Sequence, residues 1–156
     1  PVDTEELVTA EALWLATRAS VFGCMPLLVA IAFGLDPKPG MLLVPPIAFI
    51  TGFGWASFGI LIAAILKSID NFNYVTSTVV TPLFLVAGTF FPIDELPEWA
   101  QVAANVNPLY HCVELVRDAS IYGLKAADLW HLGFIVVSGL ALWRLAVGRM
   151  ERKLIA

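Results

Sequence analysis

The sequence contains 156 residues, of which 59% are hydrophobic and only 14% are charged, and its mean hydropathy is +0.82. A soluble domain carries roughly 25% charged residues, so this chain lacks the charge needed to cover a compact soluble globule. High hydrophobicity also excludes disorder. The net charge of −4 argues against a nucleic-acid binder, because such proteins present basic side chains to phosphates. We therefore expect an integral membrane protein with an all-α fold.

Residues 2–18 predict an amphipathic helix at the cytoplasmic face of the membrane. Asp3 and Glu6 have the spacing of a capping box, which starts a helix. The residues that then share one face are Leu7, Ala10, Trp14 and Thr17. The alternative is a solvated lead-in to the first membrane span. The stretch lacks the basic and apolar regions of a signal peptide, and because the first residue is Pro1, we expect a fragment that lacks its N-terminal part.

Three uncharged stretches and a fourth apolar one predict transmembrane helices, because each is long enough to cross the ~30 Å hydrocarbon core of a bilayer. They cover residues 19–35, 41–66, 72–91 and 129–147. The last stretch contains His131 and Arg144 near its ends, where a long polar side chain reaches the interface at modest cost. The chain is therefore expected to be a polytopic membrane protein formed as one unit.

The basic residues predict the orientation, because Lys and Arg accumulate on the cytoplasmic side of a membrane. Four spans place both termini on the same side. The basic residues of that side are Arg18, Lys67, Arg144, Arg149, Arg152 and Lys153, whereas the opposite side carries Lys38, Arg117 and Lys125. We therefore expect both termini in the cytoplasm.

Residues 92–122 form a long acidic segment that this topology places outside the cell. Residues 99–113 within it are uncharged, but Asn107-Pro108 interrupts them. Proline removes a backbone donor and disfavours α geometry in the residue before it. The segment therefore predicts two short helices that enter the outer leaflet and return, which the bilayer tolerates where protein or water satisfies the backbone.

A nucleotide site is not expected on this chain. Gly54 and Gly59 have the spacing of phosphate-loop glycines, but no Lys-Ser or Lys-Thr follows them. Ser57 could act as the nucleophile of an intramembrane hydrolase, with His111 or His131 as its base. Small residues on a membrane helix favour close helix packing instead. The packing prediction covers Gly52, Gly54 and Gly59.

The external segment contains further candidate groups. His111 and Glu114 share a helical face and could bind a metal, but two ligands are too few, which favours a helix-surface pair. Glu114 and Arg117 have the spacing of an ion pair, and Arg117 alternatively meets lipid phosphate or an anionic substrate. The aromatic residues are Trp99, Tyr110, Tyr122 and Trp130. They predict an interfacial belt, with a stacking surface for sugar rings as the alternative.

Four motif blocks in order resemble the signature of ABC-2 type transporter permeases: residues 88–93, 96–99, 107–111 and 114–117. The nearest likeness is to the branch with nodulation-factor (lipo-oligosaccharide) exporter permeases and daunorubicin-type drug exporters. The signature residues are Gly88, Phe90, Phe91, Pro92, Pro97, Trp99, Asn107, Pro108, Tyr110, His111, Glu114 and Arg117. The resemblance covers residues 2–150.

The resemblance implies the last four helices of a six-helix permease, with residues 92–122 as an external re-entrant hairpin. It also implies a dimer, homomeric or heteromeric, of permeases in a bacterial cytoplasmic membrane, bound to two ATPase subunits. Residues 2–18 would then couple the permease to its ATPase. The coupling residues implied are Glu5, Glu6, Glu11 and Trp14. ATP and Mg would bind the partner ATPase, leaving this chain without a catalytic residue, metal or cofactor.

The function implied is export of a lipid-linked saccharide or lipo-oligosaccharide, driven by ATP hydrolysis on a separate subunit. An exporter of amphipathic drugs is the alternative within the same family. The alternatives from other classes are an intramembrane hydrolase that uses Ser57 and a scaffold that transports nothing.

Overall fold

The structure, a computed structural model, describes residues 3–66, 68–89, 93 and 97–155. Every regular element in these ranges is helical, which confirms the all-α class. Three helices are long and apolar enough to cross a membrane, as a polytopic membrane protein requires. They are α1 (Thr4–Ala32), α2 (Val44–Ile65) and α7 (Asp128–Ile155). A 3₁₀ turn (Pro39–Leu43) precedes α2.

Helix α1 is continuous, where the sequence predicts an interfacial helix over 2–18 and a separate span over 19–35. Within α1, no glycine or proline occurs before Gly23, so nothing interrupts the helical hydrogen bonds near Arg18. At ~1.5 Å per residue, the 29 residues of α1 extend ~43 Å, which is longer than the hydrocarbon core. The amphipathic stretch therefore continues the axis of the span instead of lying at an angle to it.

The N-terminal half of α1 packs on the C-terminal half of α7. The buried residues of α1 are Val8, Ala12 and Ala16. Val8 forms an apolar cluster with Ala146 and Val147. The indole N–H of Trp143 donates to the hydroxyl of Thr9 at 3.0 Å. Because α7 also runs beyond its predicted end at residue 147, the two extensions support each other.

Helix α2 lies between α1 and α7, and small residues allow the close approach. A Cβ at Gly52 would lie 2.5 Å from the Cβ of Ala19 in α1. A Cβ at Gly54 would lie 3.3 Å from the Cα of Gly139 in α7. Gly59 does not share this role, because a Cβ there would meet no atom within 4 Å.

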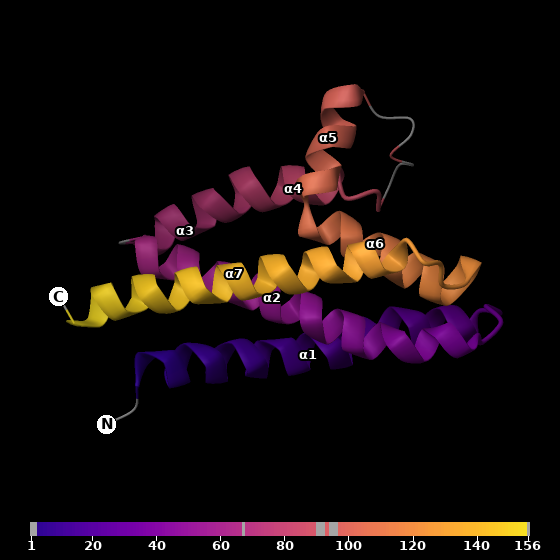
Figure 1. Cartoon of the computed structure of the whole chain (residues 1–156), viewed down its shortest axis with the longest axis horizontal. Helices are drawn as coiled ribbons and strands as arrows, with labels where there is room; N and C mark the ends of the chain where they lie inside the picture. Colours follow the sequence, from indigo (N-terminus) through magenta and orange to yellow (C-terminus); the bar gives the residue numbers. More distant parts are fainter. Residues whose placement is uncertain (1–2, 67, 90–92, 94–96, 156) are drawn as a thin grey trace.

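The described part of the predicted span over 72–91 contains a run of three helical segments that ends at Leu85. These are α3 (Ile69–Val75), a π turn (Thr76–Val80) and α4 (Thr81–Leu85). Pro82 cannot donate to the carbonyl four residues earlier, and its ring presses on that turn, which accounts for the distortion. In the view of Figure 1, the run starts near the end of the molecule that holds the termini and stops about midway along it. Membrane crossing by this run stays a prediction.

A hairpin of two short helices follows, α5 (Glu98–Val106) and α6 (Pro108–Arg117). A π turn (Asp118–Tyr122) extends α6. The interruption lies at Asn107, where the sequence predicts it. Residues 92 and 94–96 of the predicted re-entrant segment lie outside the described residues.

Both termini lie at one end of the molecule, whereas the hairpin lies in the other half, where α6 runs towards the opposite end (Figure 1). At the terminal end, the ammonium of Lys153 donates to the carbonyls of Ala63 and Leu66 at 2.7 and 3.2 Å. These carbonyls belong to the last turn of α2, which needs partners and favours a cation. The tail of α7 therefore caps α2.

We expect Gly52→Ala and Gly59→Ala to change stability in opposite directions. Alanine at Gly52 overpacks the α1–α2 contact and should destabilise the full-length protein by about 1–3 kcal/mol. Alanine at Gly59 meets open space and should gain up to about 1 kcal/mol of helix propensity. Thermal unfolding in nanodiscs measures both. Equal shifts for the two variants would contradict the packing at Gly52.

Candidate functional site

The hairpin is fixed to the rest of the molecule through the break between its helices. Asn107 is 1% exposed. Its side-chain oxygen accepts from the backbone N–H of Leu109 at 3.0 Å and thereby caps α6. Its side-chain amide donates to the carbonyl of Leu83 in α4 at 2.6 Å. One side chain thus starts α6 and ties the hairpin to α4.

A histidine pair joins the hairpin to α7. Nδ1 of His111 lies 2.7 Å from Nδ1 of His131, and Nε2 of His111 lies 2.9 Å from the carbonyl oxygen of Asn105. Burial lowers the pKa of His111 below its ordinary value, and nearby His131 lowers it further, whereas the hydrogen bond to Asn105 opposes both. His111 is therefore held as a neutral imidazole.

Arg117 connects α6 to the end of the α3–α4 run. One guanidinium nitrogen forms an ion pair with Glu114, one turn earlier, as the sequence predicts. The other donates to the carbonyl of Gly88 at 2.7 Å. Gly88 has a φ of +76°, which favours glycine. Arg117 is thus held by two partners within the chain, which accounts for it without a bound anion.

A second ion pair closes the far end of the hairpin. The ammonium of Lys125 lies 3.1 Å from a carboxylate oxygen of Asp118, and this hydrogen bond raises the pKa of Lys125. The backbone N–H of Lys125 donates to Asp128, at the start of α7. Lys38, from the loop after α1, donates to the carbonyl of Ile121. The loops at this end are therefore bound to one another.

The remaining signature residues have different surroundings. Pro97 is the N-cap of α5, and Pro108 occupies the first turn of α6, where a missing N–H is harmless. Trp99 is 71% exposed, and Tyr110 lies edge-on to His131. The members that lie outside the described residues are Phe90, Phe91 and Pro92.

The structure disfavours the enzymatic and metal alternatives. The hydroxyl of Ser57 donates to the carbonyl of Phe53 at 2.8 Å, while the two histidines of the chain pair with each other. Glu114 pairs with Arg117 and not with His111. Within the part of the chain that the structure describes, no group of three His, Cys, Asp or Glu side chains could hold a metal.

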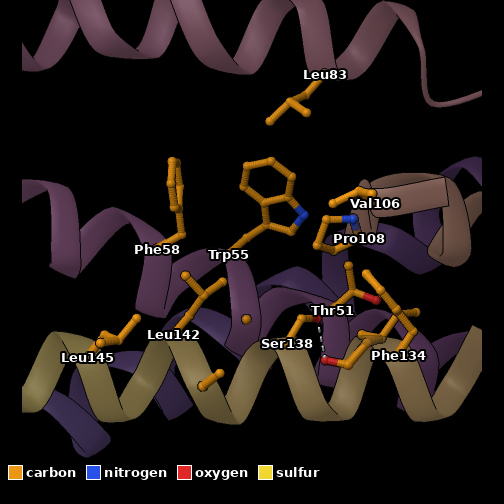
Figure 2. A pocket seen from close by; sticks show the side chains of 13 residues that line it. Thr51, Trp55, Phe58, Leu83, Val106, Pro108, Phe134, Ser138, Leu142 and Leu145 are labelled. Atoms are coloured by element: carbon orange, nitrogen blue, oxygen red, sulfur yellow. Dashed lines mark hydrogen bonds between the residues drawn. The ribbon is translucent and has the colours of Figure 1, made fainter. Parts of the chain in front are cut away.

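A cavity of about 440 Å³ lies between α2, α4, the hairpin and α7 (Figure 2). This volume lies in the range of small-molecule sites. Trp55 and Phe58 project from α2 towards Leu83 of α4, while α7 forms the opposite wall (Figure 2). The lining from α7 is Phe134, Ile135, Ser138, Ala141, Leu142 and Leu145. The cavity is thus almost wholly apolar, as the chain of a lipid requires.

Trp55 adds one polar feature to this cavity. Its indole nitrogen is buried and has no hydrogen-bond partner in the structure, and it lies on the side of Val106 and Pro108 (Figure 2). A buried donor without a partner is unfavourable by about 1–3 kcal/mol. An oxygen atom of a bound molecule would satisfy it, so the cavity suits an apolar chain that carries an acceptor.

The predicted coupling residues lie on the outside of α1, at the terminal end of the molecule. They are Glu5, Glu6, Glu11 and Trp14, and each is exposed. Leu7, from the predicted apolar face, is exposed as well. This surface is accessible to a partner, and its coupling role stays a prediction.

Sequence reasoning missed several partners in this region. Leu83 and Asn105 contribute backbone carbonyls. Every residue has such a carbonyl, so the residue type does not indicate which one will be a partner. Trp55 lines the cavity but belongs to no motif block. His111 and His131 were both visible, but nothing in their spacing of 20 residues indicated a contact.

Comparison with known proteins identifies one matching family. The family described as ABC-2 type transporter matches residues 1–120. No solved structure matches the chain significantly.

Relatives extend the match to most of the chain. Nodulation protein J of Sinorhizobium fredii (strain NBRC 101917 / NGR234) is 28% identical over 97% of this chain and 58% of its own length. Nodulation protein J of Rhizobium leguminosarum bv. trifolii is 30% identical over 96% of this chain and 57% of its own length. Capsule polysaccharide export inner-membrane protein BexB of Haemophilus influenzae is 33% identical over 55% of this chain and 32% of its own length. The chain therefore spans less than two thirds of these relatives.

We expect Asn107→Ala to destabilise the full-length protein by at least about 1–3 kcal/mol. The substitution removes the cap of α6 and leaves the Leu83 carbonyl without its partner. Asn105→Ala is the matched control, because its side chain donates only to the Gln101 carbonyl of its own helix. Thermal unfolding and protease sensitivity of the hairpin measure the effect. Equal behaviour of the two variants would contradict the role of Asn107.

Proposed function

The chain belongs to the ABC-2 type transporter family, and we propose that it forms part of the membrane permease of an ATP-driven exporter of saccharides. The observation that carries the proposal is the family match over residues 1–120. The saccharide is favoured because one relative is named for export of capsule polysaccharide.

We infer further that the saccharide is linked to a lipid. Dragging sugar hydroxyls through hydrocarbon is costly, because they lose their hydration. A lipid anchor leaves the apolar part in the bilayer, so that only the polar part needs a protein path. The cavity beside Trp55 supports this view, since its lining accepts an apolar chain and its indole N–H is ready to bind an oxygen.

Helix α7 offers a route for coupling. Its C-terminal half packs on α1 beside the exposed Glu5 and Glu6, and its N-terminal part contacts the hairpin through His131. An ATPase bound to this end of α1 would move α1 and α7 together. Energy is transferred only if the closed ATPase favours one permease arrangement over the other.

The rest of the assembly follows from the same proposal. The permease acts as a dimer with two ATPase subunits, which bind ATP and Mg. It lies in the cytoplasmic membrane of a bacterium, with the terminal end of Figure 1 in the cytoplasm and the hairpin outside.

An exporter of amphipathic drugs is the second candidate. The apolar lining of the cavity accepts such molecules as readily as a lipid chain. The substrates of the two candidate exporters differ in the saccharide part, which a drug lacks. A transport assay with both substrates distinguishes the two functions.

The first test of the proposal is reconstituted transport. We expect the full-length protein and its ATPase, in proteoliposomes, to move a lipid-linked oligosaccharide only with hydrolysable ATP. Ser57→Ala should leave this activity unchanged, because the Ser57 hydroxyl donates to the carbonyl of Phe53 within its own helix. Equal movement without any ATPase would contradict the proposal, and loss of activity in Ser57→Ala would favour the hydrolase.

The second test addresses the cavity. Trp55→Phe keeps a ring but removes the indole N–H, and the loss of one hydrogen bond of about 0.5–1.5 kcal/mol should weaken substrate binding roughly 2- to 10-fold. The control is Trp99→Phe, because Trp99 lies outside the cavity and is exposed. Substrate-stimulated ATP hydrolysis gives the apparent affinity. If both variants bound the substrate with equal affinity, the cavity would not be part of the substrate path.

A further inference from the structure

The two histidines of the chain form the contact through which the hairpin meets α7. The side chain of His111 is 1% exposed, so water does not compete for its hydrogen bonds. The ring of Phe134 stacks on His111, with centroids 4.1 Å apart. Tyr110 contacts both imidazoles, at centroid distances of 5.3 Å from His111 and 5.8 Å from His131. The two imidazoles are therefore held in a narrow range of orientations.

The direction of each hydrogen bond follows from the third partner. Nε2 of His111 faces the carbonyl oxygen of Asn105, which can only accept, so Nε2 carries the hydrogen. In a neutral imidazole, Nδ1 of His111 is then bare. The 2.7 Å contact therefore requires His131 to donate from its Nδ1–H.

This arrangement accepts one added proton but not two. A proton on Nε2 of His131 leaves its Nδ1–H free to donate. A proton on Nδ1 of His111 is accepted as well, because His131 can carry its own hydrogen on Nε2 and accept at Nδ1. Only when both imidazoles are charged do two N–H donors face each other at a distance of 2.7 Å, and the contact between α6 and α7 is then lost.

The other charged groups nearby are paired among themselves. On α6, Glu114 forms its ion pair with Arg117. At the start of α7, Asp128 accepts from the backbone N–H of Lys125. Helix α5 presents the neutral carbonyl of Asn105 to His111. On the α2 side, the Thr51 hydroxyl beside the Cys112 thiol donates to the carbonyl of Ile47 at 2.9 Å, and burial raises the pKa of that thiol.

We propose that His111 is a positioning residue, which docks the hairpin on α7 through His131 only while at least one of the two facing Nδ1 atoms is unprotonated. The hairpin stays bound to α4 through Asn107. At low pH it is therefore attached to α4 and no longer to α7. The inference rests on the proposed function only for its consequence for export, because docking is measured separately.

The sign of the pH effect follows from how many protons each state binds. Once undocked and in water, His111 binds a proton near pH 6.5 whether or not His131 carries one, whereas the docked pair holds only one added proton between the two rings. The lowered pKa of His111 in the docked state agrees with this difference. The undocked state therefore binds more protons as the pH falls below about 6.5. Docking is complete above that value and weakens below it, by up to about tenfold per pH unit.

The experiment measures the distance between the hairpin and α7 across pH. Spin labels at Val102 on α5 and Val137 on α7 use exposed positions, in the full-length permease with its ATPase in nanodiscs and with native cysteines replaced. We expect one distance above pH 7 and a longer, broader distribution at pH 4.5. A distance that does not change down to pH 4.5 would overturn the inference without any histidine variant.

Two histidine variants sharpen the test. His111→Gln and His131→Gln place an amide that can both accept and donate, so each should dock and lose the pH dependence. Asn105→Ala, which keeps its backbone carbonyl, should titrate as the wild type does. A wild-type pH profile in His111→Gln would overturn the inference.

Export assays on the same samples separate this inference from the proposed function. Docking that titrates as expected, without ATP-driven export, refutes the proposed function and supports the histidine contact. Normal export with docking that does not titrate refutes the histidine contact alone.

Discussion

A helix broken among apolar side chains leaves backbone groups that need partners, and the structure depends on how Asn107 supplies them. Its side chain caps α6 and binds the Leu83 carbonyl, so the break and the tie to α4 are one feature. Non-helical backbone is tolerated at membrane depth only where protein satisfies it. The hairpin can therefore lie against the helices without a layer of water.

With this break satisfied, the remaining contacts give the hairpin two attachments of different chemistry. Arg117 and Asn107 join it to the α3–α4 run through hydrogen bonds that do not titrate near neutrality. The histidine pair joins it to α7, and this contact depends on a bare imidazole nitrogen. A transporter needs some contacts that persist and others that exchange, and the hairpin has both kinds.

At the opposite end, α1 and α7 extend well past the length that a bilayer requires and pack on each other. Lys153 adds a cap on α2. A push on the exposed face of α1 would thus reach α7 directly. Since α7 is one unbroken helix, the same element carries both the terminal cluster around Val8 and the histidine contact.

The sequence by itself determined the membrane class, the helical fold, the break at Asn107 and the Glu114–Arg117 pair, because hydropathy, proline geometry and helical spacing are local properties. It also carried the family signature. Only the tertiary structure decided that the N-terminal half of α1 packs on α7, that Gly59 makes no close contact, and that His111 meets His131. Each of these depends on which helices lie side by side, and backbone carbonyls such as those of Leu83 and Asn105 become partners only once the chain is folded.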